Sequence, residues 1–106
     1  MLSRLIPTTN SNLHFVLCDF GRLGTAYVET DPTKADRDTI IHNLTTGQYD
    51  HPLRVIAINP AAGWSRDVSE DIARAVLKTA ERDHTSLSAG AREFVESQIG
   101  IVVADA

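Results

Sequence analysis

The fold is decided by residues 53–77, which read L-R-V-I-A-I-N-P-A-A-G-W-S-R-D-V-S-E-D-I-A-R-A-V-L. The side chains of residues 53–58 alternate between two faces that are both mostly apolar, which is typical of a buried strand. Asn59-Pro60 ends this strand, because proline has no amide hydrogen for the sheet ladder. A polar loop with the single tryptophan follows, and a helix is predicted to begin near Asp67.

The helix after the loop has a start signal and a buried stripe. Asp67 and Glu70 have the spacing of a capping box, with Asp in place of the usual Ser or Thr. Glu70 also places negative charge at the positive end of the helix dipole. Apolar residues then recur every four positions, at Val68, Ile72, Val76 and Ala80. This repeat predicts one buried helix face, and Asp83-His84 is the predicted end.

Two further strands are predicted earlier in the chain. Residues 13–20 (L-H-F-V-L-C-D-F) are apolar on both faces, as in a central strand. Residues 25–30 form the return strand, whose wetter face suits a sheet edge. The turn between them is G-R-L-G (21–24), with two glycines that can take positive φ.

Two more helices complete the set of elements. Asp31-Pro32 is an N-cap acid followed by proline at the first helical position, which predicts a helix to about Thr46 with Gly47 as its C′ residue. Ser88 is the predicted cap of a last helix that ends near Ile99.

The element order β-β-α-β-α-α predicts an α+β fold with two layers. We expect a three-stranded antiparallel sheet with strand order 2-1-3, covered by helices. One domain would span residues 13–100, with a flexible N-terminal arm at 1–12 and a C-terminal tail at 101–106.

In this topology the strand at 53–58 is a sheet edge, although both of its faces are apolar. Exposed apolar edges tend to pair with other chains. Either helices cover this edge or two copies of the chain pair along it, and on this ground we predict a homodimer.

Composition narrows the class of partner. The chain has 106 residues, enough for one domain, and its net charge of −4 provides no basic field, so nucleic acid is not an expected partner. Cys18, the only cysteine, lies in an apolar run and is expected to be a buried thiol in a reducing, cytoplasmic compartment. No run approaches the roughly 20 apolar residues of a membrane helix, and the N-terminus lacks a signal-peptide core.

No motif for catalysis, metal or cofactor is found. The loop between the strand and the helix has one glycine and no lysine, so it matches neither the phosphate-binding loop nor the dinucleotide fingerprint. The four histidines have no metal-ligand spacing and no cysteine companion. We therefore predict no catalytic residue, no metal site and no cofactor.

Candidate binding residues gather at the two ends of the predicted sheet. Asn59, Trp64, Arg66 and Asp67 lie at one end, and Trp and Arg are enriched at the energetic centres of protein interfaces. An alternative is that Trp64 seals the end of the core. The opposite end is predicted to hold Tyr49 and Arg54.

Two motifs resemble a family of small uncharacterised bacterial proteins. The first is D-F-G-x-x-G-x-A-x-x-E-T-D at residues 19–31, and the second is R-V-I-A-x-N-x-x-x-G-W-S-R-D-V-S-E-D-I-A at residues 54–73. The resemblance covers about residues 13–80. It implies no activity or cofactor, because the family carries none that can be transferred.

These observations favour a small cytoplasmic, non-enzymatic regulatory or adapter protein that acts through protein–protein contacts. The alternative is a small-molecule-binding domain or small enzyme that uses the end of the sheet formed by residues 29–31 and 59–67.

Overall fold

The computed structural model describes residues 12–101, so the predicted arm and tail lie outside the described residues except for Asn12 and Ile101. The strands are β1 (Leu13–Asp19), β2 (Thr25–Tyr27), β3 (Pro52–Asn59) and β4 (Trp64–Asp67). The α-helices are α1 (Arg37–Thr45), α2 (Ser69–Asp83) and α3 (Ala89–Ile99), and two short 3-10 helices are η2 (Gly21–Leu23) and η3 (Pro32–Lys34). The α+β prediction is confirmed.

The sheet has four strands in the order β2-β1-β3-β4, and each neighbouring pair is antiparallel. The predicted order 2-1-3 is present within it, but the prediction of three strands is wrong. The strand that was missed is β4, which lies in the segment expected to be a loop and the start of a helix.

A tight turn after β3 produces the fourth strand. The Asn59 side-chain oxygen accepts a hydrogen bond from the Ala62 amide at 2.8 Å, and the Gly63 amide donates to the Asn59 carbonyl at 2.8 Å. Gly63 takes a φ of 73°, which glycine adopts without strain. The chain therefore reverses, and Trp64 pairs with Asn59 across the two strands.

β4 covers the edge of β3 along which two copies were predicted to pair. Because β4 pairs with β3, β3 is an interior strand, and its two apolar faces no longer imply an unpaired apolar edge. The edges of the sheet are the short strands β2 and β4. Pairing of two copies along β3 is therefore not available.

The predicted first helix is divided in two. Asp31 caps η3 by accepting from the Thr33 amide at 2.9 Å, and Asp36 then caps α1 by accepting from the Thr39 amide at 3.0 Å. Two capping aspartates five residues apart start two separate helices. Gly47, with a φ of 76°, follows the end of α1 as predicted.

The later helices lie close to their predicted bounds. α2 begins at Ser69 with Val68 as its N-cap, so the predicted capping box of Asp67 and Glu70 is wrong. The Asp67 carboxylate instead accepts from the Ser69 amide at 2.8 Å, and Glu70 pairs with Arg74. α2 ends at Asp83, and His84 takes the left-handed conformation. Ser88 caps α3 by accepting from the Ala91 amide at 3.1 Å.

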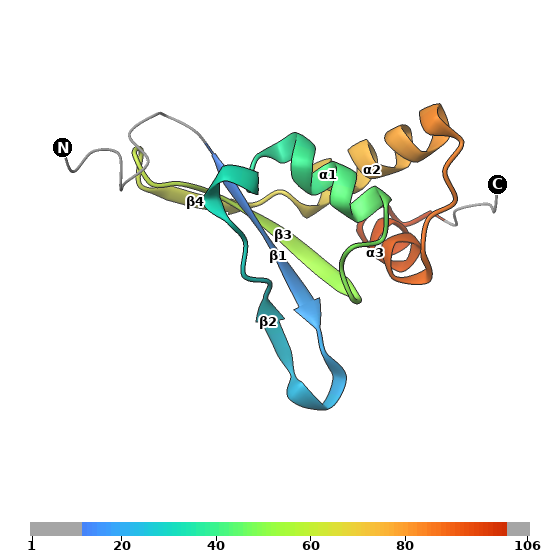
Figure 1. The fold of residues 1–106 in the computed structure, drawn as a ribbon, viewed down its shortest axis with the longest axis horizontal. Coiled ribbons are helices and arrows are strands. Elements are labelled where there is room, and N and C mark those ends of the chain that lie inside the picture. The colour runs from blue at the N-terminus through green and yellow to red at the C-terminus, as the bar shows by residue number, and fades with distance from the viewer. Residues whose placement is uncertain (1–11, 102–106) are drawn as a thin grey trace.

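All three helices pack on one face of the sheet, and the β1–β2 hairpin projects beyond them (Figure 1). The core between the layers is formed on the sheet side by Val16, Cys18 and Val55. Its largest contributions from the helices are Ile40, Leu44, Ile72, Val76, Phe94 and Val95. Alternate side chains of β1 and β3 point away from this core.

Candidate functional site

The sheet face opposite the helices is apolar, and no described helix covers it. We call it the open face, and it comprises Leu13, Phe15 and Leu17 of β1, Tyr27 of β2, and Ile56 and Ile58 of β3. These residues lie directly opposite one another as the pairs Leu13–Ile58, Phe15–Ile56 and Leu17–Tyr27. Cross-strand pairs of this kind form a continuous surface.

The open face is accessible and hollowed. Tyr27 is 55% exposed, and the other five side chains are partly exposed. A hollow of about 450 Å³ is lined by Phe15, Tyr27, Ile56, Ile58 and Ser65. The surface therefore offers apolar area and a concave shape in one place, which marks many protein interaction sites.

An ion pair lies beside the apolar residues. Arg54 stands opposite Leu17 and donates to Asp67 at 3.0 Å, while Asp67 stands opposite Ile56. Partial burial raises the pKa of Asp67, but hydrogen bonds from Ser69 and Arg54 outweigh this effect and hold it below its usual value. Asp67 is therefore ionised at neutral pH, and the two charges offset each other.

The structure brings together a different set of predicted residues from the one expected. Arg54 and Asp67 were placed at opposite ends of the sheet, yet they form one pair. Trp64 and Arg66 lie on the other face of β4, opposite Asn59 and Ala57. The Arg66 guanidinium lies 4.4 Å from the centre of the Trp64 ring, as in a cation–π contact.

Two predicted binding residues have structural roles. Asn59 is buried, and its side chain contacts Ala62 within the turn and donates to Asn12 at 2.9 Å. Tyr49 is partly buried against the core, and this burial raises its pKa. Both side chains stabilise the fold around the strands that form the open face.

The two segments of the alternative ligand site, residues 29–31 and 59–67, lie towards opposite edges of the sheet. The segment at 29–31 follows β2, whereas β4 is the opposite edge strand, and β1 and β3 lie between them. With strands about 4.8 Å apart, the two edges are separated by roughly 14 Å. The Asp31 carboxylate is already occupied by the amide and hydroxyl of Thr33.

The buried titratable groups lie within the core. Burial raises the pKa of the Cys18 thiol to about 11, so the thiol is protonated at neutral pH. Burial lowers the pKa of His14, whose ring lies 3.2 Å from the Ala35 carbonyl. Within residues 12–101, no group of three or more His, Cys, Asp or Glu side chains could hold a metal ion.

The open face was not predicted from the sequence, because apolar side chains on both faces of β1 and β3 were taken to mean that both faces of the sheet are covered. The signal was present as the alternating positions Leu13, Phe15 and Leu17, and again as Ile56 and Ile58. Only the arrangement of the helices shows which of the two faces is covered.

Comparisons of the chain with family models, curated proteins and solved structures give no match. No helix in the described part of the chain has the length and apolar character needed to cross a membrane. The motif resemblance stays a prediction.

Proposed function

We propose that this chain is a small cytoplasmic adapter or regulatory protein that acts through protein–protein contacts, and that it pairs with a second copy through the open face. The observation that carries this proposal is the cluster of six apolar side chains on a sheet face without a covering helix among the described residues. Burying such a surface yields about 25 cal/mol for each Å² removed from water.

The charge of the open face permits a second copy as the occupant. The whole chain carries a net charge of −4, so most contacts between two copies bring like charges together. The open face avoids this cost, because its centre is apolar and Arg54 offsets Asp67. A two-fold axis through the face would bring the same apolar patch of each copy together.

A dimer of this kind suits an adapter. The helices lie on the opposite side of the sheet, so both helical layers would face outwards (Figure 1). Each dimer would then present two identical helical surfaces to other proteins. The exposed apolar side chain of Leu23, at the tip of the β1–β2 hairpin, would remain outside the interface.

Replacing Ile56 with lysine tests this proposal. Two-fold symmetry would place two ammonium groups in the centre of the interface, at a cost of several kcal/mol. We expect the native protein to be a dimer by light scattering and Ile56→Lys to be a monomer, with dimer affinity lowered by at least about a hundredfold. The lysine can extend into water in the monomer, so its fold should persist.

Leu23→Lys is the matched control, because it makes the same kind of charge change at a side chain that is 90% exposed on the hairpin tip. This variant should remain a dimer. A monomeric native protein, or a dimer that Leu23→Lys dissociates and Ile56→Lys does not, would show that the open face is not the interface.

A further inference from the structure

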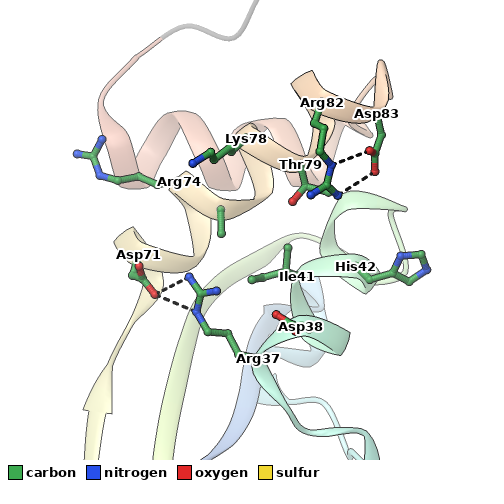
Figure 2. A pocket seen from close by; sticks show the side chains of 11 residues that line it. Arg37, Asp38, Ile41, His42, Asp71, Arg74, Lys78, Thr79, Arg82 and Asp83 are labelled. Atoms are coloured by element: carbon green, nitrogen blue, oxygen red, sulfur yellow. Dashed lines mark hydrogen bonds and ion pairs between the residues drawn. The ribbon is translucent and has the colours of Figure 1, made fainter.

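A second surface, on the helical layer, carries a pattern of charge. α1 and α2 border a groove of about 790 Å³ (Figure 2). Its cationic lining is Arg37 of α1 with Arg74, Lys78 and Arg82 of α2, and its acidic lining is Asp38, Asp71 and Asp83. The groove therefore has a net positive lining in a chain whose net charge is −4.

Three of the cations form a regular row. Arg74, Lys78 and Arg82 leave α2 at intervals of four residues, as Figure 2 shows. A rise of 1.5 Å for each residue spaces them by about 6 Å along the helix axis. Like charges at this spacing destabilise a helix slightly, so the row carries a small cost to the stability of α2.

The ends of this row are neutralised and its centre is not. Glu70 pairs with Arg74 at 3.4 Å, and Asp83 pairs with Arg82 at 2.9 Å. Among the described residues, the Lys78 side chain has neither a hydrogen bond nor an ion pair. The middle of the row on α2 therefore presents the positive charge of Lys78 without a partner, and Asp38 on α1 supplies the remaining negative charge of the lining.

Another ion pair crosses the groove. The Arg37 guanidinium donates twice to one carboxylate oxygen of Asp71, at 3.0 and 3.3 Å. Both side chains are well exposed, at 44% and 65%. Exposed pairs of this kind contribute little to stability, so an incoming carboxylate can compete with Asp71 for Arg37.

We propose that this groove binds an acidic helix of a partner protein, with carboxylates spaced every four residues along the cationic row. Such a helix repeats its charges at the same interval of about 6 Å. The groove is also lined by Ile41 and by the small side chains Ala75 and Thr79. Small residues let a third helix approach closely, as in recognition of a helix by a groove.

The interleaved acids favour a protein over a nucleic acid. Asp38, Asp71 and Asp83 would repel a continuous polyanion, and nucleic-acid binding requires many uncompensated phosphate contacts. A protein helix can carry lysine or arginine beside its glutamates, so it can satisfy both signs of charge in the groove. This inference deepens the proposed function by naming a partner chemistry, and it rests on that function only in taking the partner to be a protein.

The probe is a dye-labelled helical peptide of alanine and glutamine with glutamate at every fourth position and a lysine beside each glutamate, titrated with the full-length protein and followed by fluorescence anisotropy. We expect saturable binding that weakens as salt is raised. Lys78→Glu should lower the affinity roughly tenfold, because it replaces an attraction with a repulsion. A peptide whose central glutamate is changed to lysine should restore binding to this variant.

Lys34→Glu is the matched control, since it makes the same charge change on η3, at a residue that does not line the groove. It should bind the peptide as the native protein does. Equal loss with Lys34→Glu, no binding to the native protein, or tighter binding of a single-stranded RNA than of the peptide would each overturn the proposal. Light scattering on the same samples reports dimerisation separately, so a failure here is distinguishable from a failure of the open-face dimer.

Discussion

At the scale of single residues, Ser69 joins the first turn of α2 to the centre of the sheet. Its side chain is buried, and its hydroxyl accepts a hydrogen bond from the Val55 amide at 2.8 Å. A buried amide that loses its partner bears the full cost of its desolvation. Ser69 therefore fixes where α2 begins relative to β3.

Ser69→Ala should lower the free energy of unfolding by about 1–3 kcal/mol, because the Val55 amide is left without an acceptor. Urea denaturation followed by circular dichroism measures the change. Ser86→Ala, at an exposed position between α2 and α3, is the control and should change stability by less than about 0.5 kcal/mol. Equal stability of the two variants would contradict this role of Ser69.

His14 links stability to pH. Burial lowers its pKa below 6.5, which outweighs the opposing effect of its hydrogen bond to Ala35. The unfolded chain binds a proton as pH falls through about 6.5, and the native state does not until its own lower pKa is reached. The free energy of unfolding should therefore fall as pH drops below about 6.5, until the native pKa is passed.

His14→Asn should reduce this dependence on pH, because asparagine offers a similar donor without titrating. Urea midpoints measured at several pH values from about 5 to 8 test the expectation. The same slope in the native protein and the variant would show that His14 is not responsible.

Several helix caps could be predicted from the sequence because they depend only on local contacts. The caps at Asp31 and Ser88 and the C′ glycine at Gly47 depend only on neighbouring residues, and all three are present. Ser69 and the Arg54–Asp67 pair could not be found in this way. Both join segments that meet only after β3 and the start of α2 are placed together.

At the scale of elements, the end of α2 is strained. His84 takes a φ of 52° and a ψ of 40° at the C-cap, a conformation that glycine adopts more readily than a residue with a Cβ atom. His84→Gly should therefore raise the free energy of unfolding by about 0.5–1 kcal/mol. Thermal denaturation measures the effect, and a lower melting temperature would contradict it.

Elements defined by their own periodicity were predictable, and elements defined by a partner were not. α2 and α3 were predicted from repeats of apolar residues and from end signals, and β1 and β3 from apolar runs. β4 has the mostly polar sequence W-S-R-D and is a strand only because the turn at Asn59–Gly63 returns it to β3. The break between η3 and α1 was missed because one capping aspartate was considered and two are used.

At the scale of the whole molecule, the arrangement of the layers determines which face of the sheet is exposed. Three helices cover one face of the sheet, and the other face shows apolar side chains on three adjacent strands. The sequence showed that both faces of the inner strands are apolar, but the choice of covered face depends on how all three helices pack. The predicted homodimer therefore stays a prediction, now argued from the open face in place of the β3 edge.

The most direct measurement of the open-face interface is an isotope-filtered NMR experiment on a mixture of labelled and unlabelled protein. This experiment detects only contacts between two copies. We predict intermolecular contacts from the methyl groups of Ile56 and Leu17 to the ring of Phe15. Their absence at millimolar concentration, or intermolecular contacts confined to Leu23 at the hairpin tip, would contradict the account.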